Sequence, residues 1–239
     1  MKDKLSLTKM KKVIEKSERS FCEIRKNNDN DDNAFGFFCL LEYPDKFHKI
    51  YCLMTTNQAI NEKMINLKDN IEILLNKKII NINLNLKRNI WSSKELNFTC
   101  IEIIEEDKII KNINPFDINS NCFNKKYNNN NFDKKGILIV SKSKSKRNYY
   151  KEKDDLNFFH NCNLKVGYSG NPIILLDDLS LIGINSHFNE KENTNIGIYL
   201  SSIIHDINSN KYILKNNNND KDISSYENKD IMKIIRIII

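Results

Sequence analysis

The sequence predicts an all-β protein, either a sandwich or a barrel. Short runs of aromatic and β-branched residues recur about every ten residues, separated by Asn/Asp or Pro-Asp turns, as in all-β folds and unlike βαβ sheets. The chain has 239 residues, 40% of them hydrophobic, which suffices for one large domain or two small halves packed together. Only 6 Gly and 3 Pro exclude collagen-like and Pro/Gly-rich low-complexity chains.

The elements can be taken in chain order. Residues 3–19 carry apolar side chains at Leu7, Met10, Val13 and Ile14, a spacing that predicts a helix. Residues 201–207 are predicted to form a short helix that closes the β region. Between the two helices we expect strands over residues 20–24, 35–42, 50–55, 71–75, 78–86, 98–104, 136–141, 173–176, 181–186 and 196–200.

Three Asn-rich stretches, at 27–33, 128–131 and 216–222, are predicted loops, and the second is a plausible crossover between two halves. The chain contains about forty Asn in all, so we give individual Asn and Lys residues little weight. Residues 224–239 end in the apolar run IIRIII, which is too short to span a membrane. We expect this tail to form a helix or strand packed on the body.

The formal charge of +7 permits nucleic-acid binding, but the lysines are spread along the chain with acidic residues between them. The basic and aromatic stretch 141–153 is therefore expected to be a solvated loop, with peptide contact as the alternative. The polar, basic residues 1–12 show no secretory signal, and no segment is long enough to cross a membrane. We expect a cytoplasmic protein.

The six cysteines form no CxxC pair and no metal-ligand pattern. In a cytosolic chain they are expected to be free, half-buried thiols. They are Cys22, Cys39, Cys52, Cys100, Cys122 and Cys162.

The chemistry-bearing motif is GYSGNP at residues 167–172, followed by the apolar run IILL, a DD turn and LIGINS. Glycines on both sides of Ser169 allow a tight turn that presents its hydroxyl. They also leave the N–H groups of Gly167 and Ser169 free to form an oxyanion hole. A strand–turn–strand after the serine favours a chymotrypsin-like site over the nucleophile elbow of α/β-hydrolases, which needs a helix after the serine.

Four further segments have counterparts in the same family of peptidases as this motif. Residues 34–39 (AFGFFC), 52–60 (CLMTTNQAI) and 96–103 (LNFTCIEI) are similar to the GTGFF, LITNNHV and LDFTIIEI segments of trypsin-like serine peptidases. Residues 167–173 and 181–187 are similar to the family's GSSGSPI and VIGIHKG. The chain thus resembles this family, in particular its V8-like intracellular branch, over roughly residues 18–208.

The resemblance implies two antiparallel β-barrels of the trypsin type with an active groove between them. It divides the chain into an N-terminal helical extension (1–19), a first barrel (20–115), a second barrel with its closing helix (116–207), and an Asn-rich linker with a C-terminal tail (208–239).

The departures from the family concern its catalytic triad. Gln58 stands at the position of the general-base histidine and Asn97 at that of the orienting aspartate, so only the nucleophile position, Ser169, is kept. A glutamine cannot take up a proton near neutral pH. Losing the histidine of such a triad costs roughly 10⁶ in turnover. We expect Gln58 to donate a hydrogen bond to Ser169, and Asn97 to hold Gln58.

None of the four histidines is expected to replace the missing general base. His48 is expected in the turn before the second strand and His205 on the closing helix. His160, Asn185 and His187 are expected to line the substrate pocket, with Asn185 at the position of a pocket histidine in Glu-selective relatives. None of them is placed to reach the serine hydroxyl directly, as a general base must.

The leading hypothesis is a serine-peptidase homologue with an impaired site that binds protein or peptide segments in the groove. The first alternative is an active endopeptidase that uses Ser169 with an unrecognised base. The second is a basic scaffold that contacts nucleic acid. The sequence shows no phosphate-binding Gly-rich loop and no metal-ligand cluster, so we expect neither cofactor nor metal.

Overall fold

The computed structural model describes residue 15 and residues 18–25, 34–44, 47–67, 70–84, 87–118, 136–140, 145–152, 156–160, 168–175 and 180–209. Glu15 and residues 18–20 are helical, and the rest of the helix predicted at 3–19 lies outside the described residues. The predicted loops at 27–33, 128–131 and 216–222 and the tail at 224–239 lie outside them too.

Strands dominate the described chain. They are β1 (Phe21–Arg25), β2 (Ala34–Glu42), β3 (Lys49–Thr55), β4 (Asn70–Leu75), β5 (Lys78–Asn83), β6 (Ile90–Ser93), β7 (Phe98–Glu102), β8 (Phe116–Asp117), β9 (Gly136–Val140), β10 (Ser145–Glu152), β11 (Asn157–His160), β12 (Pro172–Leu175), β13 (Leu181–Asn189) and β14 (Thr194–Tyr199). The helices are α2 (Glu62–Leu67), α4 (Leu200–Ser209) and the short 3₁₀ turns η1 (Glu105–Asp107) and η2 (Ile110–Asn112).

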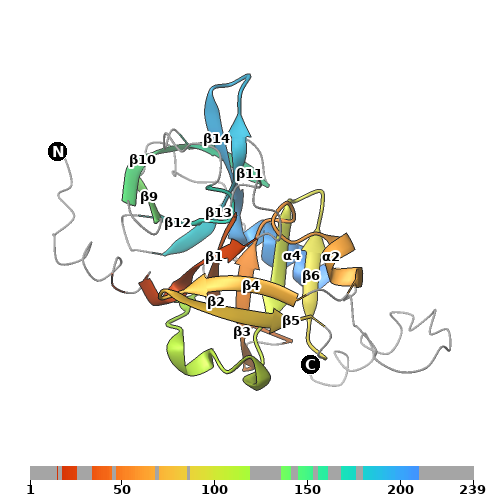
Figure 1. The fold of residues 1–239 in the computed structure, drawn as a ribbon. Helices are drawn as coiled ribbons and strands as arrows, with labels where there is room; N and C mark the ends of the chain where they lie inside the picture. Colours follow the sequence, from red (N-terminus) through yellow and green to blue (C-terminus); the bar gives the residue numbers. More distant parts are fainter. Residues whose placement is uncertain are drawn as a thin grey trace.

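The first half is a curled sheet in the order β5-β4-β1-β2-β3-β7-β6, with β8 parallel to β2 (Figure 1). All other pairs in it are antiparallel, and the β2–β3 register runs from Gly36↔Thr55 to Glu42↔Lys49. The two end strands, β5 and β6, follow one another in sequence, so the chain itself joins the two edges of the curled sheet. Inward and outward residues alternate clearly on β4, as expected for a half-buried strand.

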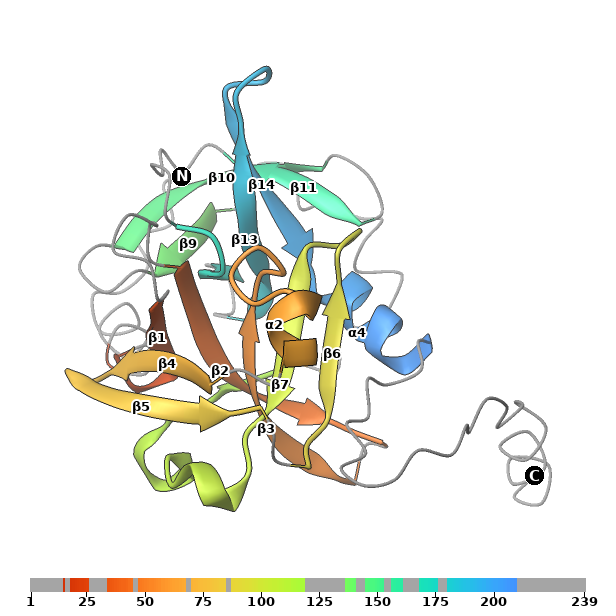
Figure 2. The same cartoon turned by 45° about the vertical axis from the view of Figure 1, so that its right-hand side comes forward.

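The second half is a closed barrel in the order β10-β11-β14-β13-β12-β9, with the β13–β14 hairpin projecting beyond it (Figure 2). A Cβ at Gly183 would lie 3.1 Å from the Phe158 ring, and one at Gly197 would lie 2.4 Å from it. These three residues therefore face the barrel interior, and the glycines make room there for the phenylalanine.

One hydrophobic core joins the two halves. Phe37 and Met54 of the first sheet belong to the same buried cluster as Leu138 and Ile184 of the barrel. Helix α4 adds Ile203 and its apolar neighbours to this cluster, and burial of its apolar face explains why the helix forms where the sequence predicted one. Each half also has a core of its own. Among the described residues no helix is both long enough and apolar enough to cross a membrane.

Most predicted strands are confirmed, and the expectation of a loop at 141–153 is wrong because β10 spans Ser145–Glu152. Its sequence, SKRNYYKE, lacks the two-residue alternation that marks a half-buried strand. The short elements α2, β6, β8 and β11 also went unpredicted. The strand expected at 78–86 ends earlier, at Asn83.

Burial of the cysteines is deeper than the sequence predicted. Cys22, Cys39, Cys52 and Cys100 are free, as expected, but they are fully buried rather than half-buried. Desolvation raises the pKa of the Cys39 and Cys52 thiols well above its ordinary value. These thiols therefore stay protonated and chemically quiet in the folded protein. Cys122 and Cys162 lie outside the described residues.

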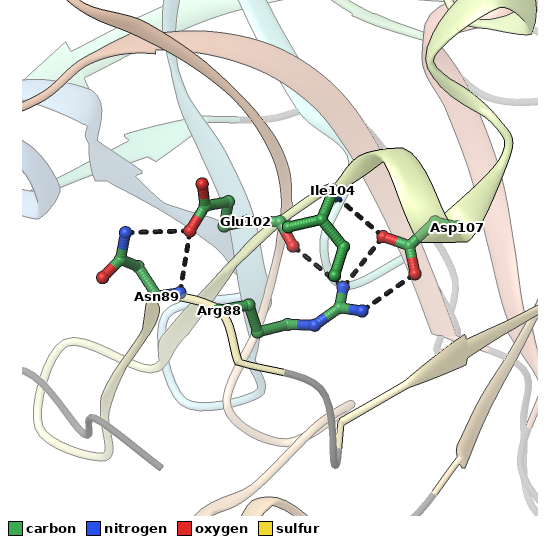
Figure 3. A network of polar contacts seen from close by, with 5 residues as sticks. All are labelled: Arg88, Asn89, Glu102, Ile104 and Asp107. Atoms are coloured by element: carbon green, nitrogen blue, oxygen red, sulfur yellow. Dashed lines mark hydrogen bonds and ion pairs between the residues drawn. The ribbon is translucent and has the colours of Figure 1, made fainter. Parts of the chain in front are cut away.

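A buried ion pair connects Arg88, in the segment before β6, to Asp107 in η1 (Figure 3). The Arg88 guanidinium donates to both Asp107 carboxylate oxygens at 2.9 Å and to the Glu102 carbonyl at 2.9 Å. Asp107 also accepts the Ile104 N–H, and Glu102 accepts from the Asn89 backbone and side chain at 2.8 Å. The ion-pair side chains are 0% and 1% exposed, so neither charge has water as a substitute partner.

Replacing one partner of this pair is expected to destabilise the fold strongly. Asp107→Ala leaves the Arg88 charge buried without a counter-charge and should cost about 3–5 kcal/mol in the free energy of unfolding, measured by urea denaturation. The double variant Arg88→Met/Asp107→Leu should recover most of that loss. Lys87→Met, at the exposed neighbouring residue, is the control and should change stability by about 0.5 kcal/mol or less. A loss below about 1 kcal/mol in Asp107→Ala would contradict this account.

Candidate active site

Gln58 lies in a single turn that directly follows β3. The Thr56 carbonyl accepts the N–H groups of Ala59 and Ile60 at 3.0 and 3.2 Å, which closes the turn around Gln58. The Gln58 side chain is exposed, whereas its neighbours Asn57 and Ala59 are buried. The turn therefore presents position 58 to solvent on a fixed backbone.

A directed chain of hydrogen bonds fixes this turn against β6 and β7. The Asn57 Nδ2 donates to Ser92 Oγ at 2.8 Å, and the Ser92 and Thr99 hydroxyls lie 2.8 Å apart. Thr99 Oγ1 donates its single hydrogen to the Ile60 carbonyl at 2.7 Å, so Ser92 must be the donor to Thr99. The hydrogen bonds thus run in one direction, from Asn57 through the two hydroxyls to the Ile60 carbonyl. None of these bonds involves the side chain of Gln58.

Asn97 contacts the Gln58 turn from the residue just before β7. Its Oδ1 accepts the Gln58 backbone N–H at 3.2 Å, and its Nδ2 donates to Ser186 Oγ at 2.8 Å. Asn97 has a φ of 50°, a left-handed conformation that asparagine tolerates better than most residues. The structure thus brings the two predicted triad positions together. It corrects the expected contact, because Asn97 holds the backbone of Gln58 rather than its side chain.

Ser186, on β13, extends this contact to a histidine. The hydroxyl of the buried Ser186 lies 2.9 Å from Nδ1 of His187, whose side chain is exposed. Sequence reasoning did not single out Ser186, although it lies inside the segment that resembles VIGIHKG. The sequence did carry one signal for Ser186, a hydroxyl-bearing residue directly after Asn185, which was expected to line the pocket.

The described residues 168–171, here called the Ser169 loop, are held against the first half through their backbone. The Phe35 N–H donates to the Ser169 carbonyl at 3.1 Å, and the Gly170 N–H donates to the Asn185 carbonyl at 2.8 Å. Gly170 has a φ of 90°, and a Cβ there would lie 1.8 Å from the Phe35 carbonyl oxygen. Only glycine fits at this position. Ser169, the predicted nucleophile, is partly exposed.

Gly167, the other expected oxyanion-hole residue, lies outside the described residues. Among the described residues, no hydrogen bond joins the Gln58 side chain to Ser169, so the bond expected between them is not formed.

His160 and Asn185 form a buried pair beneath the Ser169 loop. His160 Nε2 lies 2.9 Å from Asn185 Oδ1, and Asn185 Nδ2 donates to the Tyr168 carbonyl at 2.8 Å. His160 is 1% exposed, and desolvation lowers its pKa from 6.5 to about 4, only partly offset by the bond to Asn185. His160 is therefore neutral at physiological pH.

The remaining histidines lie elsewhere. His48 accepts the Tyr43 N–H on its carbonyl in the turn before β3, and His205 is an exposed residue of α4. Both positions agree with the sequence analysis. In the described part of the chain, no group of three or more His, Cys, Asp or Glu residues is arranged to hold a metal ion.

The depressed pKa of His160 makes stability depend on pH. The unfolded chain takes up a proton near pH 6.5, whereas the folded chain resists protonation until about pH 4. The stability of the native protein is therefore complete above pH 6.5, and about 3 kcal/mol of it is lost as the pH falls to 4. His160→Gln, which does not titrate, should lack this component in urea denaturation, whereas His205→Gln should keep it. Parallel curves for the native protein and His160→Gln would contradict the assignment.

Comparisons with known proteins were made for sequence and for structure. No family model matches the chain, and no curated protein matches it by sequence. Solved structures do match it. The inactive form of the Rv3671c protease of M. tuberculosis is 10% identical, with a TM-score of 0.55 over 82% of this chain and 91% of that one.

Two further matches agree. The serine endoprotease of Yersinia pestis is 12% identical, with a TM-score of 0.56, and the match covers 82% of this chain but 64% of that one. The protease of tobacco etch virus, complexed with product, is 12% identical, with a TM-score of 0.52 over 83% of this chain and 82% of that one. At such identities the likeness concerns the fold. The chain has the two-barrel fold of the trypsin-like, chymotrypsin-fold proteases, as the resemblance implied.

Proposed function

We propose that this protein is a catalytically impaired homologue of trypsin-like serine peptidases that binds peptide segments in the groove between its barrels. The observation that carries the proposal is the contact of Asn97 with Gln58 and Ser186. These hydrogen bonds hold positions 58 and 97 against one another, as a catalytic pair would need, but both positions carry neutral amide side chains.

The amides explain the impairment in chemical terms. A general base must accept the proton of the serine hydroxyl, and a carboxamide does not do so near neutral pH. An aspartate at position 97 would also stabilise the cation formed on a histidine, whereas the Asn97 Nδ2 donates a hydrogen bond to Ser186. Among the described residues, Ser169 therefore has no partner that takes its proton.

The second part of the proposal, peptide binding, is supported by the edge of β13. Described pairing with β12 ends at Ile184, and from His187 to Asn189 the strand pairing printed for β13 in the described part of the chain is with β14. His187 and Phe188 are exposed there. An extended peptide adds to such an edge through main-chain hydrogen bonds. The edge begins at Ser186, next to Asn97, so a bound segment would pass the Ser169 loop.

Labelling with a fluorophosphonate, which reacts with activated serines, tests the impairment. The native protein should label no faster than Ser169→Ala. The double variant Gln58→His/Asn97→Asp should label Ser169 roughly 10²–10⁴-fold faster than the native protein, because a general base contributes about that much. Gln58→His alone should gain less, because a neutral partner does not hold the imidazole in its working tautomer.

Two results would overturn the proposal of impairment. Rapid labelling of the native protein that disappears in Ser169→Ala would mean that another group activates the serine, so that the protein is an active endopeptidase. Failure of the folded double variant to label would mean that the loop does not present Ser169 in a reactive geometry.

A further inference from the structure

The outer edge of β5, here called the β5 edge, forms one border of the first sheet (Figure 2). Among the described strands β5 pairs with β4 alone. Lys78, Ile79 and Asn81 are exposed, and Ile79, a large apolar residue, is 53% exposed. Native proteins usually cover or break up such an edge, because its N–H and C=O groups can pair with another strand. The β5 edge is thus a place where a further strand can add.

The outer face of β4 and β5 determines which residues such a strand must carry. Ile79 lies opposite the half-buried Leu74, which makes an apolar row. The next row is polar, because Asn81 lies opposite Glu72, which in turn lies opposite Arg25 of β1. A strand beside β5 therefore needs an apolar residue next to Ile79. Next to Asn81 it can carry a basic residue, since the Glu72 carboxylate stands between that position and Arg25.

The inner face of the same two strands is apolar at both rows. Ile80 lies opposite Ile73, and Ile82 lies opposite Ile71. Three of these isoleucines are buried in the core of the first half, and Ile80 packs against that core. An added strand would extend this core, so it needs apolar residues at both inner positions.

The run IIRIII at residues 234–239, which lies outside the described residues, meets these requirements. When it is set antiparallel to β5 with Ile238 opposite Ile79, its only charged residue, Arg236, lies opposite Asn81. All its residues on the inner face are then isoleucines. An apolar, β-branched run of this kind also tends to aggregate when it is left exposed.

We propose that residues 234–239 add to the β5 edge of the same molecule as an antiparallel strand. The six residues of the run match the six of β5, and Lys78 lies opposite Ile239, so no like charges face each other. A shift by one residue would turn Arg236 to the apolar inner face. A shift by two would set Arg236 opposite Ile79 or leave Ile79 opposite no residue of the run.

The connection between α4 and the run is long enough for this pairing. It comprises residues 210–233. A segment of that length spans at most about 80 Å, whereas a domain of this size is about 45 Å across. The run can therefore reach the β5 edge of its own molecule.

The open edge of β13, which the proposed function uses, suits the run less well. Its residues 186–189 have the sequence SHFN, so they lack the two apolar inner rows that β5 shares with β4. The groove is therefore left to other segments, and the two proposals are independent of each other.

Cysteine cross-linking on the full chain tests the register. Directly opposite residues of an antiparallel pair are close enough for a disulfide. Oxidised glutathione should therefore join the two thiols of Asn81→Cys/Arg236→Cys, releasing two molecules of reduced glutathione. This pair should react at least about tenfold faster than Asn81→Cys/Ile237→Cys, because position 237 lies on the opposite face. Tryptic mass mapping distinguishes the new disulfide from pairs that involve the native cysteines.

Hydrogen exchange tests the same contact without added cysteines. Ile237→Asp puts a carboxylate into an apolar inner row and should release the strand, so the amides of β5 should exchange at least about tenfold faster than in the native protein. Ile231→Asp makes the same change outside the paired run and should leave the exchange of β5 as it is.

Four results would overturn the proposal. They are equal cross-linking of the two cysteine pairs, and unchanged exchange of β5 in Ile237→Asp. A covalent dimer in place of the internal disulfide would assign the run to the β5 edge of a second copy. Faster exchange at residues 186–189, rather than in β5, would place the run on the edge of β13.

Discussion

The candidate site depends on the close approach of two backbones, that of Gly170 in the second half and that of Phe35 in the first. The Phe35 carbonyl occupies the space where a side chain at position 170 would lie, and its N–H donates to the carbonyl of Ser169. Around this contact the two halves share one apolar core, to which both sheets and α4 contribute. The position of Ser169 is therefore set by main-chain atoms and packing and does not depend on the side chains at the other two triad positions.

Much of the fold could be read from the sequence, because most strands carry the apolar and β-branched pattern that half-buried strands require. Strands β6 and β11 have four residues each, too few for a periodic signal. Strand β10 consists of basic, polar and aromatic residues without a two-residue alternation, and it enters the barrel through backbone pairing with β9 and β11, which composition does not reveal. The helix at 200–209 was recognisable because its apolar face has to meet the shared core.

The candidate site was predictable only in part. Resemblance located Gln58, Asn97 and Ser169, but the contact through the Gln58 backbone depends on a turn fixed by Asn57, Ser92 and Thr99, which are distant in sequence. The pairing of His160 with Asn185 likewise joins β11 to β13 across the barrel interior. Sequence placed both in the substrate pocket, yet their depth and the neutrality of His160 come from packing. Such properties arise from neighbours that one-dimensional patterns do not specify.

The directed chain of hydrogen bonds beneath the Gln58 turn has an evolutionary consequence. Among the described residues, every hydrogen bond that holds the turn ends on the backbone or on the side chain of another residue, so none of them uses the side chain at position 58. Selection for a stable fold therefore places no constraint on that side chain, and only selection for catalysis would keep a histidine there. A lineage that no longer needed the chemistry would lose it first at this position, with the architecture left whole. The same independence means that a histidine could stand at position 58 without disturbing these hydrogen bonds.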